Sequence, residues 1–134
     1  MVHALREARR VLKPDGLLID LRPAIQHCRV GILRAGRFRP LGVAYGSLEG
    51  QRAANRAISH ILAERILRQV ARDHFECDVV FSSPGALREW LTDFNESEAG
   101  PAEERLVQHA AEASRRGRGI LAVRIALVMK QLRK

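Results

Sequence analysis

Aromatic residues and long apolar runs are scarce in this sequence. Only 4% of its 134 residues are Phe, Trp or Tyr, whereas 46% are hydrophobic, so we expect a core built from Leu, Ile, Val and Ala. No apolar run reaches the ~18 residues that a membrane-spanning helix needs, and the charges that follow Met1–Leu5 are not typical of a signal peptide. These absences predict a cytoplasmic protein that does not contact a membrane.

Motifs for metal, redox and nucleophilic chemistry are also lacking. Cys28 and Cys77 each lack a second cysteine at metal-binding or redox spacing, and the five histidines form no H-x-x-x-H pair. The sequence Ser82–Gly85 differs from the G-x-S-x-G motif around a nucleophilic serine. No glycine-rich phosphate loop follows a predicted strand. We therefore predict no catalytic residue, no metal ligand and no cofactor-binding residue in this chain.

The opening stretch predicts a helix, a turn and a buried strand in succession. Apolar residues between Leu5 and Leu12 recur at helical spacing. Lys13–Gly16 then ends the helix, because proline cannot continue it, Asp tolerates turn dihedral angles and Gly is free to take a positive φ. The apolar run Leu17–Leu21 predicts a strand buried on both faces, which requires neighbouring strands and covering helices.

This stretch resembles a signature of class I S-adenosylmethionine-dependent methyltransferases, hLpEhxRVLKPGGxhhhhD, in which h is apolar. The matching residues are Leu5, Glu7, Arg10, Val11, Leu12, Lys13, Pro14 and Gly16, with Asp15 in place of the first glycine. The resemblance implies that Leu17–Leu21 is the fifth strand of that fold. The family binds its methyl donor with the first half of the fold, so we expect a C-terminal half without a site for S-adenosylmethionine. A shortened reading frame, a wrongly assigned start codon or a small relic would each give such a chain.

The middle of the chain predicts a hairpin followed by a long helix. Two alternating segments flank Gly36, and Pro40 confines the second segment to a sheet edge. Residues 24–46 therefore form a hairpin, and the resemblance implies an insertion that covers the substrate mouth as a lid. Ser47 is a predicted cap for a helix of about 25 residues, whose apolar stripe extends to Val70.

The remainder predicts a strand, two helices and a final strand. Phe75–Phe81 alternates as a half-buried edge strand, and Ser82 or Ser83 caps a helix that begins at Pro84 and packs through Trp90. A polar loop over residues 95–101 leads to a helix at about 102–115. The apolar run Ile120–Met129 predicts a central strand covered on both faces.

Together these elements predict an α/β fold in one domain, 1–134. In the resembled family the last strand inserts antiparallel between the fifth and sixth, which implies the order Gly16–Leu21, Gly119–Met129, Phe75–Phe81. The expected architecture is a three-layer, partial Rossmann-like mixed sheet, its strands corresponding to 5-7-6, with flanking helices and a small β-hairpin insertion. The outer edge of Gly16–Leu21 then lacks a neighbour, and we expect it to form a homo-oligomer or to pair with a missing N-terminal half.

Three residues are candidates to face a substrate in this arrangement. The resemblance implies that polar groups after the fifth strand reach the cleft, which selects Arg22, His27 and Tyr45. Arg22 could hold an acidic substrate group, and His27 or Tyr45 could accept a proton. Each also has a structural interpretation: a strand-end surface charge for Arg22, a loop residue for His27 and a packing contact of the lid for Tyr45.

Two functions fit the sequence. The first is a methyltransferase-like C-terminal fragment that has no methyl-transfer activity on its own. The second is a small basic α/β module that binds a polyanion or a protein partner, because the net charge of +8 attracts phosphate groups. Nucleic acid is the weaker polyanion candidate, since aromatic residues for base stacking are few and the arginines are spread over predicted helices.

Overall fold

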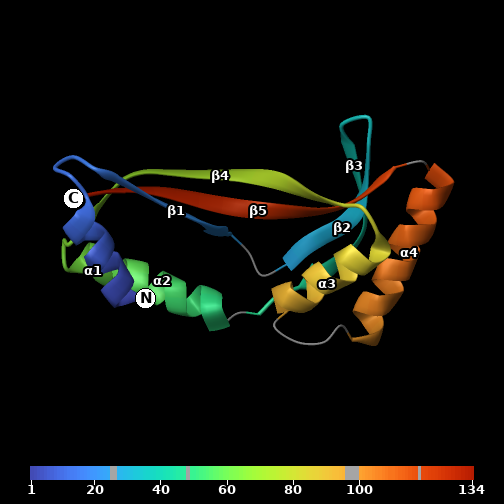
Figure 1. Cartoon of the computed structure of the whole chain (residues 1–134), viewed down its shortest axis with the longest axis horizontal. Coiled ribbons are helices and arrows are strands. Elements are labelled where there is room, and N and C mark those ends of the chain that lie inside the picture. Colours follow the sequence, from blue (N-terminus) through green and yellow to red (C-terminus); the bar gives the residue numbers. More distant parts are fainter. Residues whose placement is uncertain (25–26, 48, 96–99, 118) are drawn as a thin grey trace. The chain divides into compact units, whose positions relative to one another are not determined.

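The computed structural model of the chain describes residues 1–24, 27–47, 49–95, 100–117 and 119–134. Within these ranges the chain is a mixed α/β protein, in which the strands form one sheet and helices pack against it (Figure 1). Its elements are α1 (Val2–Val11), β1 (Leu17–Pro23), β2 (His27–Arg34), β3 (Arg37–Tyr45), α2 (Glu49–Ala63), β4 (Arg68–Phe81), α3 (Pro84–Asn95), α4 (Pro101–Gly117) and β5 (Ile120–Arg133).

The described chain divides into two compact units. The first consists of Met1–Ala24, Leu48–Phe75 and Leu127–Lys134, and the second of Ile25–Ser47 and Glu76–Ala126. Strands β4 and β5 therefore contribute residues to both units. Each unit is described below by itself.

Strand β5 pairs with three other strands. Its C-terminal part, Leu127–Arg133, lies antiparallel to Leu17–Pro23 of β1. Its N-terminal part, Ile120–Arg124, lies antiparallel to Arg29–Leu33 of β2, and β4 also pairs with β5. The hairpin partner of β2 is β3, which ends the row of paired strands. The central position predicted for the last strand is confirmed, and so is the edge position predicted from Pro40.

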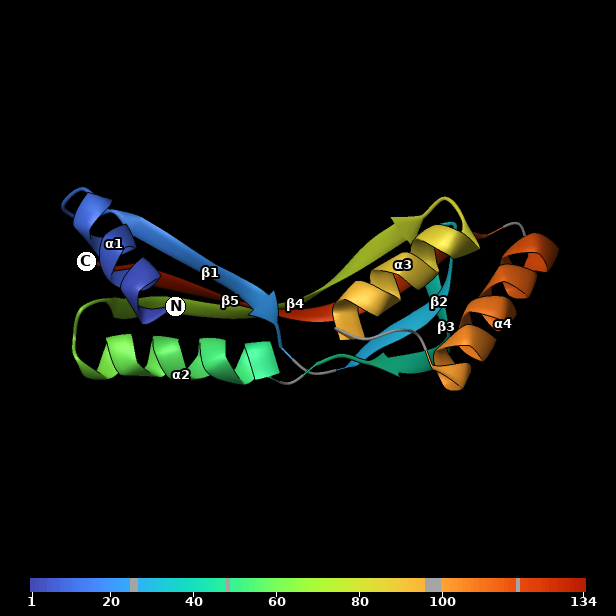
Figure 2. The ribbon, with the colours of Figure 1, turned by 60° about the horizontal axis from the view of Figure 1, so that its bottom comes forward.

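In the first unit, α1 and α2 lie on one side of the sheet (Figure 2). Their apolar stripes enclose a core of Ile58, Ile61, Leu67 and Leu132, against which Val2, Leu5, Leu12, Leu18, Leu62 and Ile66 pack. Leu18 and Leu132 are register partners across β1 and β5, so the two helices cover the face of the sheet that carries them. Burying each such side chain stabilises the fold by about 1.5–3 kcal/mol.

The opposite side of β1 corrects the prediction of a strand buried on both faces. Leu17, Ile19 and Leu21 are 42%, 55% and 51% exposed, whereas Leu18 between them packs on the helices. Because successive side chains of a strand point to opposite faces, the face of β1 that carries Leu17, Ile19 and Leu21 is left open by the described residues. The apolar run predicted a strand correctly. The described residues of this unit, however, cover only one of the two faces that the prediction expected to be buried.

The turn before β1 also differs from its prediction in one detail. Asp15, not Gly16, has the positive φ, at 61°. Gly16 is needed for another reason: a Cβ there would lie 2.8 Å from the carbonyl oxygen of Lys13, which already accepts a hydrogen bond from the Gly16 N–H. The glycine therefore permits a close backbone approach.

Helix α2 is shorter than predicted because it ends at a left-handed residue that is not glycine. Arg65 has φ 55°, its N–H donates to Leu62, and the N–H of Ile66 donates to Ile61. This is a Schellman motif, and Ile66 packs against the apolar cluster that contains Ile61. Residues beyond Arg65 that continue the apolar stripe, including Val70, belong to β4 or to the link before it.

The second unit contains the hairpin and two helices. Ala35 and Gly36 both have positive φ, at 47° and 74°, so β2 and β3 join through a type I′ turn. The predicted hairpin is confirmed over its described residues, and 25–26 lie outside them. It is continuous with the sheet, because β2 also pairs with β5.

Helix α3 begins as predicted. The Oγ atom of Ser83 accepts a hydrogen bond from the N–H of Ala86 at 3.1 Å, which confirms Ser83 as the cap. Trp90 stacks on Phe94 with ring centroids 5.0 Å apart, which confirms its packing role. Helix α4 agrees with the predicted helix, and both α4 and α3 bury apolar residues, namely Leu87, Leu91, Val107 and Ala110. Within the predicted loop before α4, residues 96–99 lie outside the described residues.

Candidate functional site

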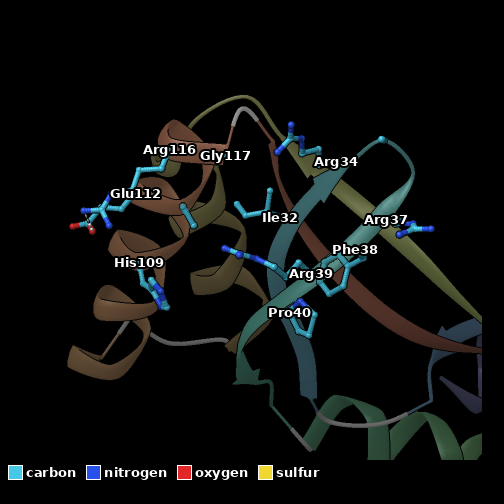
Figure 3. Close-up of a pocket in the computed structure, with 12 residues that line it drawn as sticks. Ile32, Arg34, Arg37, Phe38, Arg39, Pro40, His109, Glu112, Arg116 and Gly117 are labelled. Atoms are coloured by element: carbon cyan, nitrogen blue, oxygen red, sulfur yellow. Dashed lines mark ion pairs between the residues drawn. The ribbon is translucent and has the colours of Figure 1, made fainter.

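A cavity of about 850 Å³ lies between the β2–β3 hairpin and α4 in the second unit (Figure 3). Its volume falls within the range of small-molecule sites, roughly 300–1,000 Å³. The charged and titratable residues that line it are Arg34, Arg37, Arg39, His109, Glu112 and Arg116. The remaining lining residues are Ile32, Ala35, Phe38, Pro40, Ala113 and Gly117.

The local structure explains how these residues reach one place. The hairpin register sets Arg39 opposite Ile32, so both side chains lie on one face of the hairpin. Figure 3 shows Arg39 extending toward α4, whereas Arg37 points away from that helix. On α4, His109, Glu112 and Arg116 are spaced three and four residues apart and therefore share one helix face.

The cavity has an excess of positive charge. Glu112 is the one carboxylate among its lining residues, and its Oε2 atom lies 3.6 Å from Nη2 of Arg116. Arg34 and Arg37 are register partners next to the turn, and like charges in such a pair repel each other. Among the described residues no carboxylate forms an ion pair with Arg34, Arg37 or Arg39, so these three charges are uncompensated within that part of the chain.

A second group of charges lies on β2, β4 and β5 in the same unit. Arg124 on β5 donates to both carboxylate oxygens of Asp78 on β4, at 2.6 and 2.7 Å. Arg29 on β2 donates to Glu76. The hydrogen bonds from Arg124 lower the pKa of the Asp78 carboxyl below its usual value, and they raise the pKa of Arg124. This network is compensated, and we assign it a structural role in joining three strands.

Arg124 also contacts Phe38, one of the residues that line the cavity. Its guanidinium carbon lies 4.5 Å from the centroid of the Phe38 ring, in cation–π geometry. One face of the Phe38 ring is therefore occupied by Arg124.

The three residues selected from the sequence do not form one cluster within either unit. Arg22, in the first unit, donates to Asp20 Oδ2 at 2.7 Å and to Asn55 Oδ1 at 2.9 Å. His27 and Tyr45, in the second unit, face each other across the hairpin with ring centroids 5.9 Å apart. Neither ring lines the cavity described above.

Sequence reasoning missed the cavity. The hairpin carries Arg34, Arg37 and Arg39 within one short segment, and α4 carries His109 and Arg116 on one face, two turns apart. That concentration of basic residues around a turn was the available signal. That signal did not identify a site, because the packing of α4 against the hairpin cannot be predicted from either segment alone.

The described residues offer neither a metal-binding cluster nor a membrane-spanning helix. Within the described ranges, no group of three His, Cys, Asp or Glu side chains is placed to hold a metal ion. No helix in that part of the chain is both long and apolar enough to cross a bilayer. Comparisons with protein-family models, with curated proteins and with solved structures find no match to this chain.

Proposed function

We propose that this chain is the C-terminal half of a class I S-adenosylmethionine-dependent methyltransferase fold, and that it transfers no methyl group on its own. Its function is then to complete that fold together with a donor-binding N-terminal half. The observation that carries the proposal is the open apolar face of β1, formed by Leu17, Ile19 and Leu21.

The order of elements supports this assignment. α1, the turn at Lys13–Gly16 and β1 occur in the order and register of the family signature. β1 pairs with β5 and β5 pairs with β4, so these strands have the neighbours that the family gives to its fifth, seventh and sixth strands. The finer interpretation, a partial Rossmann-like sheet with strands 5-7-6, is part of the proposal.

The environment of β1 supplies the second argument. In the family, the fifth strand lies between two neighbours and beneath helices on both sides. Among the described residues β1 pairs with β5 alone, and only the face that carries Leu18 is covered. An apolar strand with one unpaired edge is a template for pairing with another chain. A second polypeptide that added a strand at this edge and packed a helix on the open face would complete the sheet and bury the exposed leucine and isoleucine side chains.

The described residues do not fit S-adenosylmethionine itself. The polar residue at the end of β1, Arg22, is already engaged by Asp20 and Asn55. The cavity beside α4 is lined by arginines, which repel a sulfonium cation. We therefore derive no catalytic step for this chain, and we place the donor site on the other half of the fold.

The same edge can also bind a second copy of the chain. When no N-terminal half is present, we propose that two copies pair through β1 and form a homo-oligomer. This association and the completion of the methyltransferase fold use the same strand, so they exclude each other.

Calorimetry with S-adenosylmethionine tests the proposed function. The chain alone is expected to bind no donor. Addition of a separately produced N-terminal half of a class I methyltransferase is expected to give donor binding that exceeds the binding by that half alone. Ile19→Lys on β1 should abolish the gain, whereas Val11→Lys, at an apolar residue of α1 that is also more than half exposed, should preserve it. Donor binding by the chain alone, or a gain that survives Ile19→Lys, would refute the proposal.

The basic binding module remains a second candidate function because of one observation. Arg34, Arg37 and Arg39 carry charges that no described carboxylate compensates, and they border a cavity.

A further inference from the structure

We propose that the cavity between the β2–β3 hairpin and α4 binds a small organic anion that has an apolar body, such as an aromatic phosphate ester. The site lies wholly within the second unit and includes no residue of β1. The inference is therefore independent of the methyltransferase proposal.

The charge of the cavity selects an anion. Arg34 and Arg39 line it from the hairpin, and Figure 3 shows Arg39 extending toward α4, whereas Arg116 points away from the hairpin and toward Glu112. Glu112 is the one carboxylate among the described lining residues, it lies 3.6 Å from Arg116, and no described carboxylate forms an ion pair with Arg34 or Arg39. Planar guanidinium groups form bidentate hydrogen bonds with phosphate and carboxylate groups. An anionic ligand would also relieve the repulsion between Arg34 and its register partner.

The apolar lining selects a ligand with a hydrophobic body. Ile32 is only 5% exposed, and Phe38, Pro40 and Ala113 add further apolar surface to the walls. Small-molecule sites combine such a lining with a few polar groups that orient the ligand. An inorganic ion would leave these apolar walls in contact with water.

A small molecule fits the cavity better than a single-stranded nucleic acid does. Nucleic-acid grooves combine a basic track with aromatic rings that are free for base stacking. Here Phe38 is the one Phe, Tyr or Trp ring among the described lining residues, and Arg124 already occupies one of its faces. The cavity also has the volume of a single ligand site.

Isothermal titration calorimetry with 1-naphthyl phosphate tests this site in the full chain. Inorganic phosphate provides the charge without the apolar body, and 1-naphthol provides the body without the charge. We expect 1-naphthyl phosphate to bind at least about tenfold more tightly than either one, because both parts contribute to binding. Weaker binding at higher salt is expected as well.

Two charge-neutralising variants locate the site. Arg39→Gln should weaken 1-naphthyl phosphate binding about tenfold, which is the loss expected for a charge-assisted hydrogen bond. Arg115→Gln removes the same charge from an exposed position of α4 outside the cavity and should change binding less than about twofold. Arg39 is exposed and has no described ion-pair partner, so its replacement should leave the circular dichroism spectrum unchanged.

Several results would overturn the proposal. They are an absence of 1-naphthyl phosphate binding at millimolar concentration, equal losses in Arg39→Gln and Arg115→Gln, and equal affinities for inorganic phosphate and 1-naphthyl phosphate. Tighter binding of a single-stranded oligonucleotide, also weakened by Arg39→Gln, would assign the cavity to nucleic acid instead. None of these results depends on S-adenosylmethionine or on an N-terminal half.

Discussion

Strands β1 and β2 both pair antiparallel with β5, yet they differ strongly in burial. β2 has β3 on its other edge, and its Cys28, Val30 and Ile32 are buried. β1 has no second neighbour among the described residues, and alternate side chains along it are exposed. The more continuously apolar strand is therefore the less buried one.

This difference shows that the apolar pattern of a strand does not by itself determine how deeply the strand is buried. The run Leu17–Leu21 contains a single charged residue, Asp20, whereas β2 tolerates Arg29 and Gly31 and is still well packed. Two neighbouring strands and a covering helix bury β2 regardless of its composition. The composition of β1 suits neighbours on both edges, which is why we infer an additional segment beside it.

The largest expected contrast comes from one substitution made in both strands. Ile32→Ala on β2 should lower the free energy of unfolding by about 2–5 kcal/mol, because it leaves a hole in a packed core. Ile19→Ala on β1 should change it by no more than about 0.5 kcal/mol in dilute protein, because that side chain is mostly exposed. Urea unfolding of both variants measures the contrast, and equal losses would contradict the difference in burial.

Cysteine labelling gives a second contrast, in reaction rate. Burial raises the pKa of the Cys28 thiol on β2 to about 11. At pH 8 its reactive thiolate is then about a hundredfold scarcer than that of an ordinary thiol. In a Cys77→Ser background, iodoacetamide should modify Ile19→Cys on β1 rapidly while Cys28 stays largely unmodified, as peptide mass mapping can show. Faster labelling of Cys28 than of position 19 would reverse the comparison.

The ion pair between Arg124 on β5 and Asp78 on β4 should make the free energy of unfolding depend on pH. Since Arg124 lowers the folded-state pKa of Asp78, the stability that Asp78 contributes is complete above the unfolded-state pKa near 3.8. That contribution is lost as the pH falls through the lower folded-state value. Asp78→Asn should therefore flatten the acid limb of a urea-unfolding series from pH 6 to pH 2.5, whereas Asp93→Asn, at an exposed position of α3, should retain it. An unchanged acid limb in Asp78→Asn would show that the pair is not maintained in solution.

The smallest expected effect is at the turn that closes β2 onto β3. Ala35 holds φ 47°, a region that asparagine tolerates better than alanine does. Ala35→Asn should raise the free energy of unfolding by about 0.5–1 kcal/mol, and Ala35→Val should lower it. Thermal unfolding of the two variants checks the sign, and a destabilised Ala35→Asn would argue against the type I′ turn.

Elements bounded by strong local signals were predicted well from the sequence. Pro14 and Gly16 mark the end of α1, Gly36 marks the hairpin, and Ser83 with Pro84 marks the start of α3. These signals act within a few residues, so no tertiary information is needed to interpret them.

Features without a local signal were missed or misjudged. Helix α2 ends where Arg65 takes a left-handed backbone conformation, and an arginine gives no indication of that conformation in the sequence. The beginning of β4 follows that end, so β4 was predicted too short. The exposed face of β1 and the basic cavity both depend on which distant segments pack together, which periodicity does not encode.

The most direct test of the account is sedimentation equilibrium of the chain and its Ile19→Lys variant over a range of concentrations. Our account predicts that the unmodified chain associates, that Ile19→Lys is monomeric because a lysine on β1 blocks the open strand, and that Val11→Lys associates like the unmodified chain. A chain that stays monomeric at all concentrations, or an Ile19→Lys variant that associates as strongly as the unmodified chain, would contradict the claim that β1 is an interface.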